Sequence, residues 1–311
     1  MWLPIITFFT HQDHALKALF WNTREMFAPP SSDIKFSSIN YGVYDPSFDP
    51  DVHRTFSDAK DVAIEHIFIS WLYPDLTSDG SSVAERFDYS QERNRWLMVT
   101  VEPVSDGREP VSGDLLKQIG DGAYDENITA VCKKLGGLNA PIFIRWGHEM
   151  DSPNNRYPWS HGSPDDYISA YRHFVTTCRE WIRNGYYIWS PLGVAGFADY
   201  WPGKKYVDYV GLIVFGTTQI DILTLGQPRS FTEVFTPLYE RVIAFDLPVM
   251  IAELGVEGEP AYQDAWLRGL FRNAKQFPLL KTAVYFNAKD VVKWAEELDI
   301  PDWRVSGQVF E

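Results

Sequence analysis

The chain has 311 residues, of which 45% are hydrophobic and 23% charged, and its formal net charge is −14. This negative excess argues against binding to nucleic acid or to an anionic membrane surface, because phosphate recognition needs clustered Lys and Arg. No apolar run approaches the roughly 18 residues that a membrane span requires. The length suits a single α/β barrel as well as it suits two smaller domains.

Short β-rich runs alternate with helical patterns along the chain, which is typical of βα units and a parallel sheet. The pattern predicts eight strands, at residues 40–44, 66–73, 96–103, 141–149, 186–191, 209–216, 248–255 and 282–287. Helices are expected at 163–185, 230–245 and 260–277. We therefore expect an α/β fold of the (β/α)8 TIM-barrel type over residues 40–311, with residues 1–39 as an N-terminal wrap packed on it. A doubly wound sheet is the alternative, but no G-x-G-x-x-G follows the first strand.

The predicted strands end in ionisable, polar or aromatic side chains that could react with or bind a substrate. The active sites of such barrels lie at these strand ends. The residues with these side chains are Tyr44, Trp71, Glu102, His148, Glu149, Trp189, Phe215, Glu253 and Asn287. A lone strand-end Glu often serves only an ion pair, but Glu149 and Glu253 both emerge from buried runs, where a carboxyl pKa is commonly shifted. Two carboxylates facing each other across a barrel mouth suit glycoside hydrolysis, in which one donates a proton and the other attacks or activates water.

Aromatic residues are abundant, with 12 Trp and 16 Tyr in the chain. Many stand beside Pro, Gly or a polar residue rather than inside apolar runs. Each one is explained equally well as a core residue, but collectively they favour flat platforms for sugar rings. Strand-end placement, together with the family resemblance described below, makes Trp71, Trp159 and Trp189 the candidate platforms.

Cys132 and Cys178 lack the C-x-x-C spacing of a zinc or redox site and fall in predicted helices. Buried free thiols are the simplest expectation, and a single disulfide remains open. The N-terminal run MWLPIITFF has no basic segment and no small-residue cleavage site, so it does not read as a signal peptide. A secreted or periplasmic location is nevertheless expected, with a leader not visible in this chain.

Several motifs follow one another in a recognisable order: GVYDPSF, VTVEP, GAYDENI, IFIRWGHEM, YPW, WSP, IAELG, AVYFN and DWRV. With these pieces the chain resembles glycoside hydrolase family 26, a (β/α)8 family of retaining enzymes best known as β-mannanases. The resemblance implies that Glu149 is the general acid/base on the fourth strand and Glu253 the nucleophile on the seventh. It also implies that His148 binds the sugar at the cleavage point and that Arg145 orients the carboxylates.

The same resemblance implies a polysaccharide or oligosaccharide substrate and no cofactor or metal. The protein is also expected to be a monomer. A retaining mechanism needs the two carboxyl groups about 5–5.5 Å apart. It also needs Glu149 to be neutral while Glu253 is ionised, and partial burial beside an anionic Glu253 would raise the pKa of Glu149. Glu102 is expected to support the site or to contact sugar rather than to act as a third catalytic acid.

The motifs depart from the family pattern around the expected sugar site. Mannanases of the family usually read HEMNGxWYPW, whereas this chain reads HEMDSPNNRYPW, with Arg156 in place of a Trp. Phe215 replaces a Tyr whose hydroxyl would hydrogen-bond the nucleophile, and Leu192 follows WSP in place of Asn. Arg156 would suit a sugar with a carboxylate, pyruvyl or other acidic group, as in a decorated exopolysaccharide, although a solvated loop Arg is an equally simple interpretation.

Three other functions remain to be weighed. A carbohydrate-binding protein that has lost catalysis is favoured by Phe215 but not by the presence of both glutamates. A metal-dependent hydrolase would use His148, Glu149, Asp151 and His161. The zinc-protease spacing H-E-x-x-H, however, would need His where Ser152 stands. A phosphate-binding barrel is disfavoured because no Gly-rich turn follows the last two strands.

Overall fold

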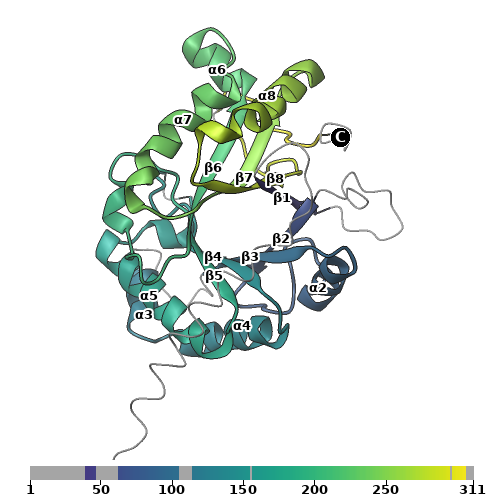
Figure 1. The fold of residues 1–311 in the computed structure, drawn as a ribbon. Helices are drawn as coiled ribbons and strands as arrows, with labels where there is room; N and C mark the ends of the chain where they lie inside the picture. The colour runs from purple at the N-terminus through teal and green to yellow at the C-terminus, as the bar shows by residue number, and fades with distance from the viewer. Residues whose placement is uncertain (1–38, 47–61, 105–113, 155, 295, 306–311) are drawn as a thin grey trace, which may run out of the picture.

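The computed structural model describes residues 39–46, 62–104, 114–154, 156–294 and 296–305. Within these ranges eight parallel strands close into a barrel in chain order (Figure 1). The strands are β1 (Asn40–Tyr44), β2 (Val62–Ser70), β3 (Trp96–Glu102), β4 (Ile142–Trp146), β5 (Gly185–Trp189), β6 (Tyr209–Thr217), β7 (Val249–Glu257) and β8 (Leu280–Phe286).

Helices pack around the outside of most of the ring of strands (Figure 1). The α-helices are α2 (Val83–Glu92), α3 (Asp114–Gly120), α4 (Asp125–Gly137), α5 (Pro164–Trp181), α6 (Thr218–Leu225), α7 (Phe231–Val242) and α8 (Pro260–Asn273). Short 3₁₀ helices are η2 (Pro158–Ser160), η3 (Phe197–Tyr200), η4 (Ile243–Phe245) and η5 (Ala274–Gln276). The predicted single-domain TIM barrel is therefore confirmed. The N-terminal wrap expected over 1–39 lies outside the described residues, except for Ile39.

Side chains alternate between two buried layers along each strand, as the pleat of a strand requires. One layer fills the barrel interior and includes Ile64, Met98, Phe143, Ile188, Met250 and Val284. The larger layer lies between the barrel and the helices, and it receives the residues of opposite parity, such as Val99, Ile144 and Ile251. The parity of a strand residue therefore decides whether its side chain reaches the barrel mouth or the helix layer.

Strand β2 begins at Val62, four residues before the predicted start. The charged Glu65 interrupts the apolar run, which hid the first half of the strand from pattern analysis. In the structure Glu65 is buried because its two oxygens contact Arg86 at 2.6 Å and Arg95 at 3.2 Å. Charge pairing thus allows a carboxylate inside a strand that otherwise buries apolar side chains.

The predicted helix at 163–185 is α5, which ends at Trp181 and is followed directly by β5. Ser163 caps it, because the side-chain oxygen accepts a hydrogen bond from the backbone N–H of Asp166 at 3.2 Å, and Pro164 occupies the first turn. The other two predicted helices each end in a 3₁₀ turn, α7 in η4 and α8 in η5.

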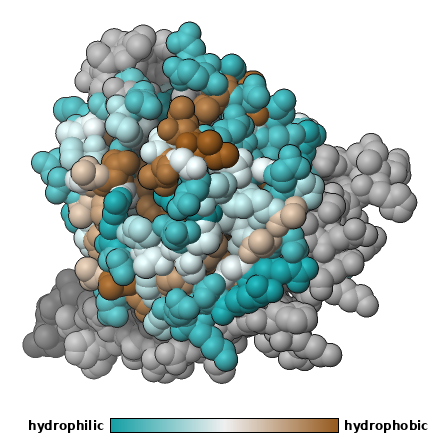
Figure 2. All heavy atoms as spheres, turned by 90° about the horizontal axis from the view of Figure 1, so that it is seen from above, coloured by the Kyte–Doolittle hydropathy of each residue, from teal (hydrophilic) through white to brown (hydrophobic). Residues whose placement is uncertain are grey.

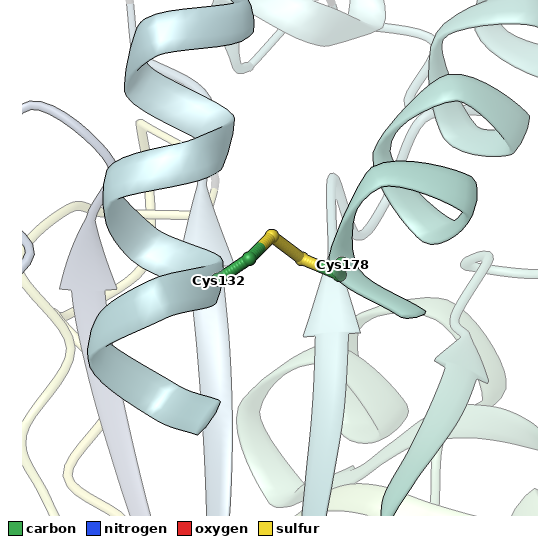
Figure 3. Close-up of a disulfide and its surroundings, with 2 residues drawn as sticks. All are labelled: Cys132 and Cys178. Carbon is green, nitrogen blue, oxygen red and sulfur yellow. A yellow bond between two sulfur atoms is a disulfide. The ribbon is translucent and has the colours of Figure 1, made fainter. Parts of the chain in front are cut away.

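Cys132 and Cys178 form a disulfide that joins α4 to α5 (Figure 3), with a Cα–Cα distance of 4.9 Å. The expectation of free thiols is therefore wrong. The alternative considered from the sequence, a single disulfide, is confirmed. Sequence could place both residues on helices but not show that adjacent helices α4 and α5 pack with these positions facing each other.

Most of the large apolar side chains are buried, but α6 exposes Ile222, Leu223 and Leu225, each by more than half. In Figure 2, which shows the side where α6 projects in Figure 1, hydrophobic atoms gather in patches among hydrophilic ones. Among the described residues, no helix combines the length and the apolar character needed to cross a membrane.

Candidate active site

The chain turns sharply where β4 ends, and this turn carries Glu149 into the barrel mouth. Both Gly147 and Glu149 have positive φ, 53° and 54°, a backbone conformation that is uncommon for a residue with a side chain. The N–H of Glu149 donates to the carbonyl of Ser190 at the end of β5, at 2.9 Å, which ties the turn to the neighbouring strand. Such a strained position at a strand end is typical of functional sites.

A β-bulge in β7 brings Glu253 to the same place. The strand register is irregular between Ile251 and Leu254, and both of these residues face the helix layer. The two residues between them, Ala252 and Glu253, can therefore both direct their side chains into the barrel. Ala252 packs in the interior core. Bulges next to active sites re-aim a side chain in this way.

Arg145 connects the two strands inside the barrel. It lies on β4, is fully buried, and donates through Nη1 to Oε1 of Glu253 on β7. This ion pair places a fixed positive charge against the Glu253 carboxylate. The Nε and Nη2 atoms of Arg145 are also buried, and their N–H groups donate to no other group among the described residues.

The carboxyl groups of Glu102, Glu149 and Glu253 share the barrel mouth. Burial, followed by the nearby charge of Glu253, raises the pKa of Glu149 to about 7. The same two causes raise the pKa of Glu102 to about 7, against the lowering effect of Arg145 and Arg156. Glu149 is therefore poised to give and take a proton near neutral pH, which is the property expected of a general acid/base.

Glu149, Glu253 and His148 lie close together, with a ligand atom of each within 4.8 Å of the others. At least one oxygen of Glu149 and one of Glu253 are therefore close neighbours, as the short carboxyl spacing of retaining glycosidases requires. The same three groups could in geometry hold a metal ion. Arg145 argues against it, because its positive charge already occupies Glu253 and would repel a divalent cation.

His148 is buried between aromatic rings at this site. Its ring centroid lies 4.9 Å from that of Tyr157 and 6.1 Å from that of Phe68, in edge-on arrangements. Burial, with a smaller contribution from Arg145, lowers its pKa well below the usual range. His148 is thus a neutral imidazole, which can both donate and accept a hydrogen bond.

Trp159 lies beneath the site rather than on its surface. Only 1% of it is exposed, and its Nε1 donates to the carbonyl of His148 at 2.6 Å. The ring of Tyr157 stacks on it, with centroids 4.6 Å apart and an interplanar angle of 8°. Tyr157 is half-buried, so it is the ring of this stacked pair that a sugar can reach, and Trp159 supports it.

Trp71 and Trp189 are not positioned as sugar platforms, and that prediction is wrong. They are 1% and 0% exposed, and both lie in the layer between barrel and helices. Trp71 stacks on Tyr124 of the region before α4, while Trp189 packs against Phe245. Their strand parity explains this, because the inward-facing neighbours in the two strands are Ser70 and Ile188 by alternation.

Asn287 has a structural role instead of facing the site. Its side-chain oxygen accepts from the N–H of Val305 at 3.0 Å, and its amide nitrogen donates to Asp45 at 3.3 Å. These contacts tie the end of β8 to the chain after β1 and to the C-terminal segment. The residue before it, Phe286, is the one whose ring lies with the interior aromatic residues.

Aromatic rings line the mouth on the side of β1, β2 and β8. Tyr44, Phe68 and Phe286 pack together, with ring centroids of Tyr44 4.9 Å from Phe68 and 4.8 Å from Phe286. Phe215 extends this wall, 6.3 Å from Phe286 and 5.4 Å from Trp294. In strand register Phe215 lies beside Gly255, and it is Ile213 that lies beside Glu253.

Asp151 holds the loop after β5 and does not serve a metal. Its carboxylate accepts hydrogen bonds from the backbone N–H groups of Leu192, Gly193 and Val194, at 2.7–3.1 Å. His161, the other partner of the metal-site alternative, is exposed. The four-residue metal site considered from the sequence is therefore not assembled, since one of its carboxylates is occupied by backbone donors.

Arg156 is exposed on the loop after β4, and its Nη2 lies 3.6 Å from Oδ1 of Asp290. Its charge lowers the pKa values of Glu149 and Glu102 against their burial. Arg156, which replaces the Trp usual in the family, is therefore close enough to Glu149 for its charge to act on that carboxyl group.

The model of glycosyl hydrolase family 26 matches residues 109–276, more than half of the chain, and this stretch includes both Glu149 and Glu253. The chain belongs to glycosyl hydrolase family 26. Endoglucanase H of Acetivibrio thermocellus is 25% identical over 259 residues, covering 78% of this chain and 26% of that protein. A β-1,3-xylanase from a Vibrio species is 28% identical over 107 residues, covering 32% and 22%. This family 26 chain thus spans about a quarter of the length of the curated relatives it matches.

Solved structures of family 26 proteins share its fold. A β-mannanase from Bacteroides ovatus superposes with a TM-score of 0.62 at 16% identity, covering 94% of this chain and 90% of that one. An endo-β-1,4-mannanase from Cellulomonas fimi gives 0.60 at 19% identity, covering 90% and 69%. At these identities the similarity shows that the fold is shared, and it does not identify the substrate of this chain.

Several residues of the mouth escaped the sequence analysis, namely Phe68, Tyr157, Phe286, Asp290 and Trp294. Phe68 and Phe286 have the same parity as the other inward-facing residues of their strands, so counting parity would have found them. Tyr157 stands inside the quoted YPW motif but was passed over for the larger Trp159. Asp290 and Trp294 lie in the loop after β8, where nothing in the sequence indicates that the chain turns back over the mouth.

Proposed function

We propose that this family 26 chain is a retaining β-glycoside hydrolase that cleaves a β-linked polysaccharide. The observation that carries the proposal is the pair Glu149 and Glu253, two buried carboxylates from β4 and β7 with oxygens within 4.8 Å. They differ in environment, because Glu253 is paired with Arg145 while Glu149 has its pKa raised to about 7. Two nearby carboxyls in unlike environments take unlike roles.

In this mechanism Glu253 attacks the anomeric carbon while Glu149 gives its proton to the leaving oxygen. The bond from the anomeric carbon to that oxygen breaks as the bond to Glu253 forms. Glu149, now a carboxylate, then removes a proton from water, and the water oxygen displaces Glu253 from the anomeric carbon. Arg145 holds the Glu253 carboxylate in place, and neutral His148 is available to hydrogen-bond a sugar hydroxyl.

The substrate we propose is β-mannan-like or a decorated bacterial exopolysaccharide, and the action is endo-β-mannanase-like. The similar proteins include endo-β-1,4-mannanases, an endoglucanase and β-1,3-xylanases, so the family accepts several β-glycans. Around the two carboxylates, Tyr157, Phe286 and Trp294 are half-buried rings at the mouth. Such rings suit stacking against sugar faces.

The test is release of reducing sugar by wild type and by Glu253→Ala from β-mannan, mixed-linkage β-glucan, β-1,3-xylan and acidic bacterial exopolysaccharides. Cleavage of one polymer by wild type is expected, with a loss of at least about a thousandfold in the variant, because the nucleophile is gone. Proton NMR of the first product should show the β anomer, as double displacement retains configuration. Appearance of the α anomer first would overturn the retaining mechanism.

The alternative is a catalytically impaired carbohydrate-binding protein on the same barrel. Phe215 favours it, since Phe cannot hydrogen-bond a nucleophile as a Tyr hydroxyl would. Against it stand the presence of both carboxylates and the Arg145 pairing of Glu253. Retention of a polymer by a protein that releases no reducing sugar from the whole panel would support this alternative and exclude the hydrolase.

We further propose a secreted or periplasmic location and a polysaccharide as the only class of partner, with neither nucleic acid nor a cofactor. The disulfide between Cys132 and Cys178 supports the location, because such bonds persist in oxidising compartments and are rare in the cytosol. The net charge of −14 disfavours nucleic acid.

A further inference from the structure

The loops that follow β4 and β8 meet over the barrel mouth. In the closed strand order β1 to β8, these two strands stand on opposite sides of the ring. Arg156 comes from the first loop and Asp290 from the second, and their Nη2 and Oδ1 atoms are 3.6 Å apart. This contact, here called the clasp, therefore spans the opening in which Glu149 and Glu253 lie.

Asp290 is held in the clasp by its own loop and not by Arg156. Its Oδ2 accepts from Nε1 of Trp294 at 2.7 Å, and its Oδ1 accepts from the N–H of Val291 at 2.7 Å. A weaker bond from Val292 at 3.4 Å adds to these. The Asp290 carboxylate thus keeps its position and most of its hydrogen bonds whether or not the guanidinium is present.

Arg156 is held only loosely. Its distance of 3.6 Å to Asp290 exceeds the range of a good N–H···O hydrogen bond. Among the described residues this is its one ion pair, and its remaining contact is with the ring of Tyr157, 5.4 Å from the centroid. Its side chain is 36% exposed. A planar group with five donors is therefore open to a ligand, and a carboxylate is the partner that fits it in two parallel bonds.

The position of this guanidinium indicates which sugar it would contact. It shares a loop with Tyr157 and follows Glu149 closely in the chain. Burial is the largest single influence on the pKa of Arg156 and lowers it, but the charges of Tyr157, Glu149, Asp290 and Glu253 together raise that pKa above its usual value. Arg156 lies over the ring of Tyr157, and that ring is 4.9 Å from the ring of His148, the residue before Glu149. Since Glu149 protonates the leaving oxygen in the proposed mechanism, the guanidinium lies toward the leaving-group side of the bond.

We infer that Arg156 binds a carboxylate on the sugar at the leaving-group side, with that carboxylate replacing Asp290 as its ion-pair partner. The preferred substrate is then a β-glycan bearing uronic acid or pyruvyl groups, not a neutral one. This inference rests on the proposed function. It accounts for how a chain of net charge −14 can accept an anionic polymer, because one positive charge is supplied locally where the polymer must bind.

The experiment uses pairs of substrates that differ only in the carboxylate. Each β-glycan that the enzyme cleaves is compared before and after carbodiimide-mediated reduction of its uronic acids, and before and after mild-acid removal of its pyruvyl ketals. Neutral β-glycans are compared with their C6-oxidised forms. The two treatments separate uronic acid from pyruvyl as the group recognised.

The variants are Arg156→Gln, Asp290→Asn and, as a matched control, Arg268→Gln, whose guanidinium pairs with Asp264 on the outer helix α8. At a pH below the alkaline limb of the profile, Arg156→Gln should lower kcat/KM about ten- to a hundredfold on the carboxylated member of a pair and less than about threefold on the neutral member. Because both members meet the same Glu149, any shift in its pKa cancels in their ratio. Asp290→Asn should raise kcat/KM on the carboxylated member, since a competing carboxylate is removed, and Arg268→Gln should change neither.

An equal loss on both members in Arg156→Gln, reproduced by Asp290→Asn, would overturn the inference, because the clasp would then only hold the two loops together. A wild-type preference for the neutral member would overturn it too. Failure of the proposed function has a different signature, namely no hydrolysis on any polymer or hydrolysis that survives Glu253→Ala.

A binding measurement makes the inference independent of turnover. The Glu253→Ala protein, with and without Arg156→Gln, is run in affinity gels that contain each member of a pair. Stronger retardation by the carboxylated polymer that disappears with Arg156→Gln supports the inference. Absence of any Arg156-dependent retardation across all pairs overturns it.

Discussion

Glu149 combines features that a proton donor needs near neutral pH. It is 6% exposed, stands beside another carboxylate, and sits on a left-handed backbone that directs it into the mouth. Burial and the charge of Glu253 favour its protonated form, while Arg156 and Arg145 oppose them. The balance leaves its pKa near the pH at which a general acid works best.

The pH dependence of kcat/KM tests this assignment. Since the acid must be protonated in the free enzyme, activity should fall about tenfold per pH unit above a pKa of about 7. Arg156→Gln removes a charge that lowers this pKa, so the alkaline limb should move to higher pH, measured on a neutral substrate. Arg268→Gln is the control and should leave the limb in place. If the alkaline limb did not move in Arg156→Gln, the charge of Arg156 would have no effect on the pKa of Glu149, contrary to this prediction.

Helices α4 and α5 form one covalently linked element through Cys132 and Cys178. Helices in this barrel run opposite to the strands, and Cys178 lies in the last turn of α5, close to where β5 begins. The disulfide is therefore at the end of the barrel remote from the mouth. It should affect the stability of the fold without altering the chemistry of the site.

Removing the disulfide should lower the free energy of unfolding by about 2–4 kcal/mol. The bond closes a loop with a sequence separation of 46 residues, and restricting the unfolded chain accounts for an effect of this size. Urea unfolding of wild type and of the double variant Cys132→Ala, Cys178→Ala, each with and without reductant, measures it. The reductant should destabilise only wild type, and both proteins should keep the same kcat/KM. Equal stabilities in the absence of reductant would contradict this prediction.

The described part of the molecule is a closed barrel whose strands all pair on both sides, so it offers no open sheet edge to another chain. Its exposed large apolar side chains include a short set on α6 and Val291 and Val292 after β8. Patches of a few hundred Å² are usual on monomers. We therefore retain the prediction of a monomer.

Sedimentation equilibrium should give the mass of one chain, 35.8 kDa, at all protein concentrations. The triple variant Ile222→Ser, Leu223→Ser, Leu225→Ser should behave in the same way and unfold at nearly the same denaturant concentration, because these side chains are mostly in water already. A mass that rises with concentration in wild type and not in the variant would contradict the monomer and identify α6 as the contact.

Local patterns were enough to predict the barrel, all eight strands and three helices. Alternation of apolar residues, the Ser163 cap with Pro164, and the turn residues between runs are properties of neighbours in the chain, so they are readable without a structure. Predictions from the sequence failed where a residue far away in the chain allowed a side chain to be buried that would otherwise be exposed. Glu65 looked like a break in a strand until Arg86 and Arg95 came beside it.

The amino-acid order alone identified Glu149, Glu253, His148, Arg145 and Glu102 as candidates, because strand ends in a barrel converge and motifs preserve residue types. It could not show the bulge that turns Glu253 inward, the parity that buries Trp71 and Trp189, or the pairing of cysteines on adjacent helices. Arg145 meets Glu253 across 108 residues, and Arg156 meets Asp290 from opposite strands. Such contacts depend on which surfaces the closed barrel brings together in space, and packing of the whole chain sets them.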